Sequence, residues 1–340
     1  MTLSSIGKPS LIAKQVVQID STLAVHLPRT NMIHTLAKPK LVDVLACPGC
    51  KSPLNSTIKC DNCGLEFAED SGTPKLFDPN FSRTVQFEFS ANRAVIEEQK
   101  LQEYFNYPPS VKVSDKLPYH LEPAQFKVIN ELPANQKVLE IGCGGGQMRE
   151  WFVQKGHQYI GVDISKTRVH DWLQKFGGPD ILCDAHSLPF GDNQLDVIYS
   201  AAVTEHLACP HLVVQEIARV LKPGGYYLGN VSFLEPWHDN SFFHMSPLGA
   251  IELLTQAGFE IKYVWPEKGY SAFRSMFAMG NGVTKNMRFI GDIAYFAYLM
   301  ENNLKNWGRK IFKRPEKRNI KQAAKVSGAI FWIATLPAES

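Results

Sequence analysis

The central part of the chain alternates short apolar runs with stretches that have helical spacing. Residues 138–141, 159–162 and 195–200 are apolar over nearly their whole length, as in strands buried on both faces. Residues 213–221 have the apolar spacing of a helix, and the Lys-Pro-Gly-Gly of residues 222–225 is typical of a helix end followed by a chain reversal. This alternation predicts an α/β fold.

The same pattern predicts elements on both sides of this region. In chain order they are a helix at 122–132, strands at 226–233 and 259–264, and a final strand at 329–334. Ser246 and Pro247 fit the N-cap and first turn of a further helix, which would end before Gly258.

Three glycines follow the first apolar run at alternate positions: Gly142, Gly144 and Gly146. Such a run predicts a tight turn from a strand into a helix that begins near Gln147. Glycine is needed there because the backbone turns sharply and a ligand approaches without a Cβ in its way.

Dinucleotides and S-adenosylmethionine (SAM) both bind at turns of this kind. Asp163 ends the second strand, 21 residues after Gly142, and its carboxylate could accept hydrogen bonds from the ribose of either ligand. The spacing differs from the dinucleotide pattern G-x-G-x-x-G, in which a helix N-terminus faces a pyrophosphate. Glu140 favours SAM, whose sulfonium and amino groups are positively charged. An NAD-dependent enzyme remains the alternative.

Two later strand ends carry further polar groups. Asp184 and Ala185 follow the run 180–183, and a carboxylate there could accept a hydrogen bond from an adenine amino group. The strand that ends at Ser200 opens into the Thr-Glu-His-Leu of residues 204–207.

Taken in order, these motifs resemble the class I SAM-dependent methyltransferases of type 11. The motifs are E-x-G-x-G-x-G, a strand-end Asp, D-A-x-x-L-P-F, D-x-I-x-S…E-H-L and L-K-P-G-G, and together they cover roughly residues 125–265. The resemblance implies a Rossmann-like sheet of seven strands in the order 3-2-1-4-5-7-6, with helices on both faces, and SAM as cosubstrate. The residues that it assigns to SAM are Glu140, Gly142, Cys143, Gly144, Gly146, Asp163, Ile164, Asp184, Ala185 and Ser200.

Three histidines are candidate catalytic residues. Methyl transfer from a sulfonium is an in-line displacement, and a base helps when the acceptor is a hydroxyl or a ring nitrogen. His206 follows the fourth strand, where the methyl group is expected, and is the first candidate, although it could instead be a structural residue at this E-H-L position. His238 and His244, in the loop after the fifth strand, are the alternatives. The same loop supplies candidate acceptor-pocket walls: Trp237, Phe242 and Phe243.

Four of the seven cysteines form a C-x2-C…C-x2-C set. They are Cys47, Cys50, Cys60 and Cys63. Two such turns can place four thiolates around one structural Zn²⁺, and the pattern predicts a zinc ribbon. Cys143, inside the glycine loop, is interpreted as a small packing residue rather than a nucleophile.

The segment around these cysteines resembles the small zinc-ribbon proteins that act as partners of tRNA and protein methyltransferases. Here the ribbon is fused to the methyltransferase-like region, as it also is in a bacterial rRNA guanine methyltransferase. The ribbon could support the N-terminal part of the fold or help to recognise a substrate, and four thiolates in a short hairpin favour the folding role.

Composition and charge narrow the function only slightly. The 340 residues are 44% hydrophobic and 20% charged, with a net charge of +3, which by itself does not indicate nucleic-acid binding. Nine basic residues lie between positions 305 and 325, with Glu316 as the only acidic one. They belong to an insertion, residues 265–328, in which an aromatic segment at 289–300 precedes the basic stretch. Three interpretations remain open: a lid or homodimer contact, an interfacial membrane helix, or a patch that contacts RNA.

Domain boundaries and location follow from these assignments. We expect an N-terminal arm (1–40), a zinc ribbon (41–80), a linker or helical cap (81–120), and a methyltransferase domain (121–340) that contains the insertion. The first 30 residues lack the basic start and apolar core of a signal peptide, and no apolar run is long enough to span a bilayer. A cytoplasmic location is expected.

Two classes of function remain. The strand-five loop and the insertion favour transfer of a methyl group to an O or N atom of a small-molecule or sugar-containing acceptor. The ribbon and the basic stretch would instead suit an RNA base methyltransferase. A non-catalytic SAM-binding scaffold is a third hypothesis, disfavoured by the intact glycine loop and Asp163.

Overall fold

The computed structural model describes residues 43–84, 98–113, 117, 118, 120–167, 173, 175–238, 240–280, 282–315, 317 and 319–338. The predicted N-terminal arm and residues 85–97 of the predicted linker lie outside these ranges.

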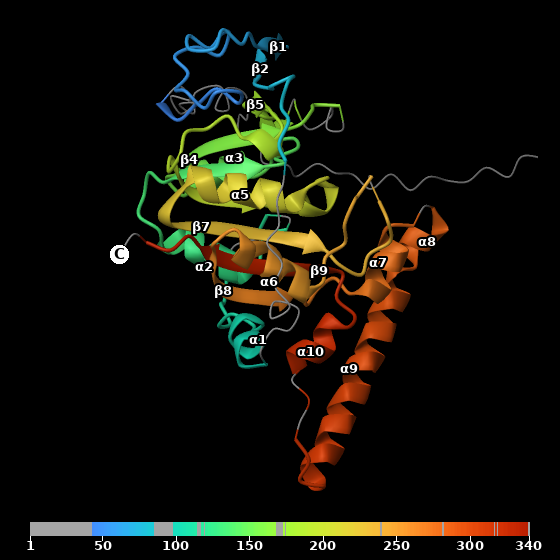
Figure 1. The fold of residues 1–340 in the computed structure, drawn as a ribbon. Helices are drawn as coiled ribbons and strands as arrows, with labels where there is room; N and C mark the ends of the chain where they lie inside the picture. Colours follow the sequence, from blue (N-terminus) through green and yellow to red (C-terminus); the bar gives the residue numbers. More distant parts are fainter. Residues whose placement is uncertain are drawn as a thin grey trace, which may run out of the picture. The chain divides into compact units, whose positions relative to one another are not determined.

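The described residues form one nine-stranded sheet in the order β1-β2-β5-β4-β3-β6-β7-β9-β8 (Figure 1). Its strands are β1 Ala68–Asp70, β2 Thr73–Lys75, β3 Lys137–Ile141, β4 Gln158–Asp163, β5 Ile181–Leu182, β6 Leu195–Ser200, β7 Leu221–Ser232, β8 Glu260–Pro266 and β9 Ala329–Thr335. From β5 to β8 the order is the predicted 3-2-1-4-5-7-6, with β9 antiparallel to both β7 and β8. This confirms the Rossmann-like fold.

The sheet is larger than the seven strands predicted. The hairpin β1–β2 comes from the end of the cysteine-rich segment and extends the sheet beyond β5. Lys75 of β2 pairs in parallel with Leu182 of β5, and the N–H of Leu76 donates to the Leu182 carbonyl at 2.8 Å. The backbone N–H and C=O groups of an edge strand are open to pairing, and this hairpin uses those of β5.

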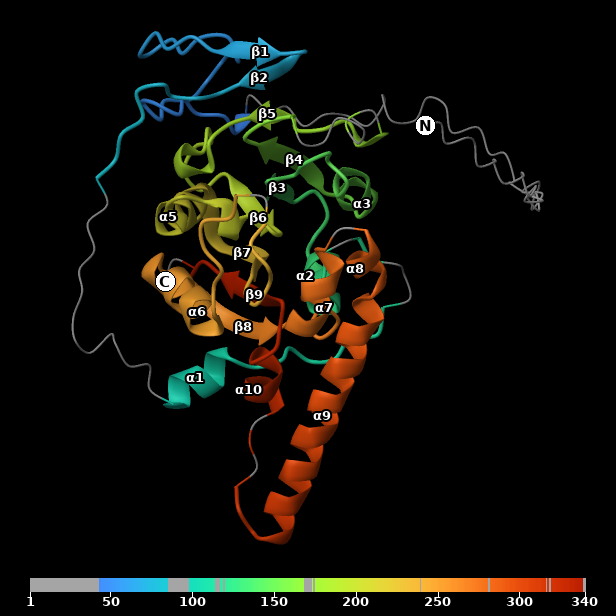
Figure 2. The same cartoon turned by 90° about the vertical axis from the view of Figure 1, so that its right-hand side faces the viewer.

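Helices cover both faces of the sheet, as predicted, with α5 and α6 on one face and α2 and α3 on the other (Figure 2). The helices and 3₁₀ turns are α1 Glu98–Tyr104, α2 Pro123–Glu131, α3 Arg149–Gln154, η3 Ala185–Ser187, η4 Thr204–His206, α5 Pro210–Val220, α6 Pro247–Gln256, α7 Ala272–Ala278, α8 Val283–Asn286, α9 Arg288–Ile311 and α10 Asn319–Ala324. The Ser246 side chain caps α6 as expected, accepting a hydrogen bond from the N–H of Gly249 at 3.2 Å.

One predicted boundary was wrong. The Lys-Pro-Gly-Gly segment was expected to reverse the chain before a strand at 226, whereas β7 already begins at Leu221. Leu221 is buried and pairs beside Leu195, and the register shifts between Leu195 and Val197. Gly224, at φ +79°, takes the left-handed conformation that this irregular start requires.

Candidate functional site

The three glycines of the loop after β3 all have positive φ, between +54° and +85°. A Cβ on Gly142 would lie 2.3 Å from a methyl carbon of Val203, and one on Gly146 would lie 3.0 Å from the Gly178 carbonyl oxygen. The sequence argument for glycine at this turn is therefore confirmed by both backbone conformation and space.

Asp163, at the end of β4, stabilises this loop through hydrogen bonds of its carboxylate. One carboxylate oxygen accepts the N–H of Gly144 at 2.8 Å, and the other accepts the N–H of Ile164 at 2.7 Å. The oxygen bonded to Ile164 also accepts the N–H of Ser165 at 3.3 Å, whereas the oxygen bonded to Gly144 keeps a second lone pair that can accept a hydroxyl group of a ligand. Ile164 itself is exposed beside it.

Glu140 lies buried beneath the loop and not on its surface. Its carboxylate accepts a hydrogen bond from the hydroxyl of Tyr159. Burial raises the pKa of Glu140 to about 8, more than the Tyr159 hydrogen bond and nearby Arg149 lower it. A positive ligand on this side would favour the carboxylate form and would lower that pKa.

A second pair, half-buried Arg149 and buried Asp180, supports the same loop. Arg149, in the first turn of α3, bonds to the Asp180 carboxylate at 3.0 Å and to the Gly178 carbonyl at 2.9 Å, and its guanidinium lies over the Tyr159 ring. Asp180 also accepts the N–H of Gly161 at 2.9 Å. The sequence does not predict a role for Tyr159, Arg149 or Asp180, because no spacing pattern along the chain connects the three residues.

Asp184 is oriented by its neighbour. Its carboxylate accepts the N–H of His186 at 2.9 Å and lies 2.6 Å from the Nδ1 of that ring. The other ring nitrogen, Nε2, accepts the N–H of Cys209 at 3.1 Å, so Nδ1 carries the proton that Asp184 accepts. These bonds lower the pKa of Asp184, which keeps it a hydrogen-bond acceptor. The adjoining Ala185 is half-buried.

The remaining two residues assigned to SAM are buried. The hydroxyl of Ser200 lies 3.0 Å from that of Tyr227, and the side chain is only 2% exposed. Cys143 is also buried, and burial raises the pKa of its thiol well above the ordinary value. A protonated, enclosed thiol fits the packing role expected of Cys143.

The structure brings the three candidate histidines together at the carboxyl ends of β6 and β7. The ring centroids of His206 and His238 are 5.5 Å apart, and those of His238 and His244 are 5.6 Å apart. His206 lies in η4, which follows β6, whereas the other two come from the loop after β7. Ligands of open α/β sheets bind at this edge, which also carries the glycine loop.

Two buried carboxylates lie next to these histidines. Glu205 and Glu235 both accept hydrogen bonds from the Ser232 hydroxyl, at 2.6 Å and 3.1 Å. Burial raises the pKa of Glu235 to about 7. Donor atoms of Glu205, His206 and His238 lie within 4.8 Å of one another, a spacing that a divalent metal ion could also use.

The aromatic residues of the same loop have a different environment from the one expected. Trp237, Phe242 and Phe243 are all exposed rather than enclosed. The indole N–H of Trp237 donates to the carbonyl of Ser241 at 2.9 Å, which holds the loop in a closed turn.

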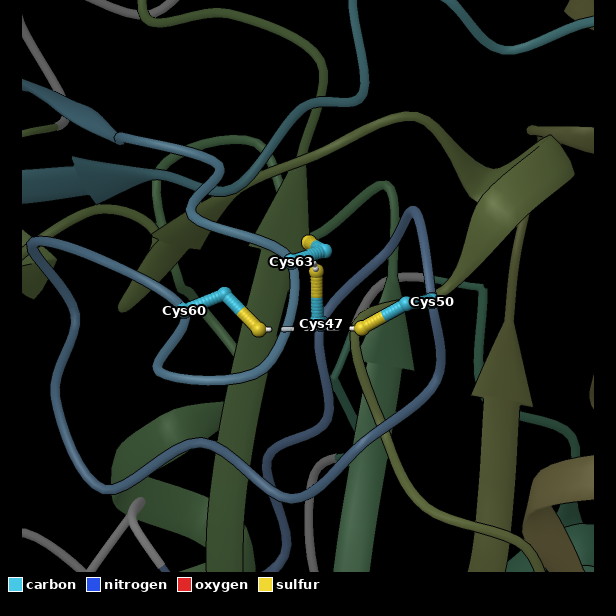
Figure 3. Close-up of side chains that lie close together, drawn as sticks. All are labelled: Cys47, Cys50, Cys60 and Cys63. Atoms are coloured by element: carbon cyan, nitrogen blue, oxygen red, sulfur yellow. Dashed lines mark hydrogen bonds between the residues drawn. The ribbon is translucent and has the colours of Figure 1, made fainter.

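The four clustered cysteines point toward one another (Figure 3). The Sγ atoms of Cys47 and Cys63 are 3.6 Å apart, as are those of Cys50 and Cys60, and all four lie within 4.8 Å. Four sulfurs in a tetrahedron with Zn–S bonds of about 2.3 Å would be ~3.8 Å apart. The donor set and its spacing therefore fit one zinc ion.

This cysteine segment packs directly on the loop that carries Asp184. Backbone bonds join Ala46 to Pro189 at 3.0 Å and Gly191 to Val44 at 3.0 Å. The hydroxyl of Ser187 donates to the carbonyl of Pro48 at 3.0 Å.

Buried Glu216, on α5, bonds both to the cysteine segment and to the loop that carries Asp184. Its carboxylate accepts from Lys51 at 3.3 Å, from Arg219 at 2.7 Å and from the Leu188 N–H at 3.0 Å. No pattern in the sequence predicted that the ribbon and the Asp184 loop would meet.

Comparisons with known proteins agree with this geometry. Residues 139–229 match the family model described as a methyltransferase domain. This match spans the glycine loop, Asp163, Asp184 and His206.

Relatives and solved structures are similar over limited lengths. A protein named as a probable S-adenosylmethionine-dependent methyltransferase of Mycolicibacterium smegmatis is 33% identical over 139 residues, 38% of this chain and 54% of that protein. The 2-methyl-6-phytyl-1,4-hydroquinone methyltransferase of Synechocystis is 30% identical over 130 residues, 36% of this chain and 41% of that protein.

A complex of the Haloferax volcanii Trm112 methyltransferase activator with a protein assigned as a methyltransferase aligns at a TM-score of 0.42 and 18% identity. That alignment covers 63% of this chain and 89% of the other. The chain spans about 36% to 54% of the length of the curated relatives that it matches.

Proposed function

We propose that this protein transfers a methyl group from SAM to a small-molecule or sugar-containing acceptor, at an oxygen or nitrogen atom. One observation carries the proposal. The glycine loop, Asp163 and the three histidines lie at one edge of the sheet, and all of these except His238 and His244 fall inside the region that matches the methyltransferase family model.

The residues divide into two groups in this proposal. Asp163 and Asp184 would bind the adenosine part of SAM, Glu140 would attract its positive charges, and the glycines would allow its close approach. His206 would take the acceptor proton, since an imidazole changes charge near neutral pH. His238 and His244 are the alternatives for that proton.

We also propose that Cys47, Cys50, Cys60 and Cys63 bind a structural zinc ion, as their donor set and spacing fit one. When bound, zinc would fix the two cysteine turns and with them the contact to the Asp184 loop. A cytoplasmic location goes with this proposal, because reduced thiols and SAM are both intracellular.

RNA is the second candidate acceptor, favoured by the basic stretch of residues 305–325, which begins near the end of α9. A variant with Lys313→Gln, Arg314→Gln, Lys317→Gln and Arg318→Gln separates the two. Unchanged turnover of a small acceptor by this variant would exclude RNA, whereas turnover of RNA alone, steeply weakened by salt, would exclude the small acceptor. The screen that finds the acceptor uses detection of the methylated product over metabolites, glycans and total RNA.

Binding of SAM provides the first test, and Glu140 gives it a pH signature. Because its pKa is raised to about 8, the carboxyl is neutral in acid and gains its charge as the pH rises through that value. SAM affinity should therefore increase with pH up to about 8, and Glu140→Gln should lower the affinity roughly tenfold at high pH and flatten the profile.

Calorimetry at several pH values measures both effects, with Glu150→Gln as control, because Glu150 is an exposed carboxylate on neighbouring α3. Absence of any heat of binding with SAM or its demethylated product would refute the proposed function. An unchanged profile in Glu140→Gln would refute only the role of Glu140.

A further inference from the structure

Helix α9 has an apolar stripe that no other described element covers. Seven large apolar side chains on it are 45% to 65% exposed: Phe289, Ile293, Phe296, Met300, Leu304, Trp307 and Ile311. They recur every three or four residues over a helix of 24 residues, about 36 Å long. At about 100° per residue they fall within an arc of roughly 80° on the helix surface.

The opposite side of α9 is the side that packs on the protein. Gly291 is the one residue of α9 that is buried, and a Cβ on it would lie 2.4 Å from the carbonyl oxygen of Phe273 in α7. The hydroxyl of Tyr298 donates to the carbonyl of Gln322 in α10 at 2.9 Å. Asn306 and Lys317 exchange two bonds of 3.2 Å. The stripe thus points away from the elements that hold the helix, and Figures 1 and 2 show α9 extending away from the sheet.

The charge around the stripe is positive. The basic side chains gather at and after the C-terminal end of α9: Lys305, Arg309, Lys310, Lys313, Arg314 and Lys317. The two acidic residues of the helix, Asp292 and Glu301, are paired with Arg274 and Lys305. The apolar stripe therefore adjoins a basic region without an opposing free carboxylate on α9 itself.

We propose that α9 lies in the surface of a membrane that contains anionic phospholipids, with the stripe in the acyl-chain boundary and the basic end at the headgroups. Aromatic and aliphatic side chains on one face and basic ones beside it are what such a surface binds. Among the described residues no helix is long and apolar enough to cross a bilayer, so α9 would lie on the membrane rather than span it. The inference does not depend on the proposed function.

Flotation of the zinc-loaded 340-residue chain with phospholipid vesicles tests this proposal. The protein should float with vesicles that contain phosphatidylglycerol, and less with phosphatidylcholine alone or in high salt. The triple variant Phe296→Gln, Leu304→Gln, Trp307→Gln should reduce partition by more than about a hundredfold, because three buried apolar groups are lost. Lys310→Gln, Lys313→Gln, Arg314→Gln should reduce it by about a hundredfold and only on anionic vesicles.

Ile58→Gln with Leu248→Gln is the matched control, because both side chains are exposed apolar groups outside α9. This variant should float like the original protein. Failure of the original protein to float on anionic vesicles in low salt would overturn the proposal, as would unchanged flotation of the stripe variant. Light scattering that shows a dimer without flotation, or RNA binding without flotation, would assign the face to another copy or to RNA instead.

Discussion

The cysteine segment of residues 43–77 and the insertion between β8 and β9 both add to the same Rossmann-like sheet. The first joins the edge beyond β5, and the second leaves the sheet and returns to it at β9. Two residues of the insertion, Ile320 and Ala324 on α10, join the core, but the apolar residues of α9 have the opposite surroundings from those of the cysteine segment. Val44, Leu45 and Leu76 belong to the main core, whereas α9 contributes only Gly291 as a buried residue.

The difference separates two uses of apolar side chains. In the cysteine segment the apolar side chains are buried beside backbone hydrogen bonds to the sheet and beside the buried carboxylate of Glu216. The segment and the sheet should therefore fold as one unit. On α9 the apolar side chains are periodic but exposed, and a stripe of this size on a soluble surface indicates a binding face. The free energy of unfolding should therefore change with substitutions in the cysteine segment and hardly with substitutions on the apolar stripe of α9.

Removal of the metal ligands should have the largest effect. Cys60→Ser leaves three thiolates, and loss of the zinc that we propose should cost on the order of several kcal/mol and lower the melting temperature. Zinc content per chain and thermal unfolding measure this. Cys209→Ser, which changes a half-buried cysteine outside the cluster, should leave both unchanged. Equal melting temperatures for the two variants would mean that the cysteine cluster does not stabilise the fold.

Loss of the buried charge at the contact should have the next largest effect. Glu216→Gln leaves Lys51 and Arg219 without their buried partner and should cost about 3–5 kcal/mol. Burial raises the pKa of Glu216, but bonds from Arg219 and Lys51 outweigh it, so the pKa is lowered overall. Its contribution to stability is thus present above the ordinary carboxyl pKa and is lost as pH falls through the lowered value.

Urea unfolding at neutral and acidic pH measures the effect of Glu216→Gln. Asp192→Asn removes the exposed partner of Arg219 and should cost less than about 1 kcal/mol. A smaller loss in Glu216→Gln than in Asp192→Asn would contradict the role of Glu216 in joining the two sides.

A matched pair of leucines gives the most direct comparison, and its exposed member, Leu304, should give the smallest effect. Leu45→Ala, in the cysteine segment, should cost about 2–5 kcal/mol because the side chain is buried in the core. Leu304→Ala, on α9, should change stability by less than about 0.5 kcal/mol because the side chain is exposed. Urea unfolding of both variants is the measurement, and a costly Leu304→Ala would mean that the stripe is covered in solution.

Features that depend on local spacing could be predicted from the amino-acid sequence. Glycines at alternate positions specified the positive-φ turn of residues 142–146, two C-x2-C turns specified the thiol cluster, and continuous apolar runs specified the buried strands. These patterns are visible in a sequence because the residues involved are neighbours along the chain.

The tertiary structure alone decided the features that join distant residues. Tyr159 reaches Glu140, and His238 reaches His206, because parallel strands align their ends. The cysteine segment meets the Asp184 loop because β5 leaves an edge open. The spacing along α9 indicates one apolar face but not which face packs on the protein. That choice depends on the close approach of Gly291 to Phe273, two residues that are 18 positions apart along the chain. Only the folded chain brings such contacts about, since they depend on the positions of whole elements and not on any local pattern.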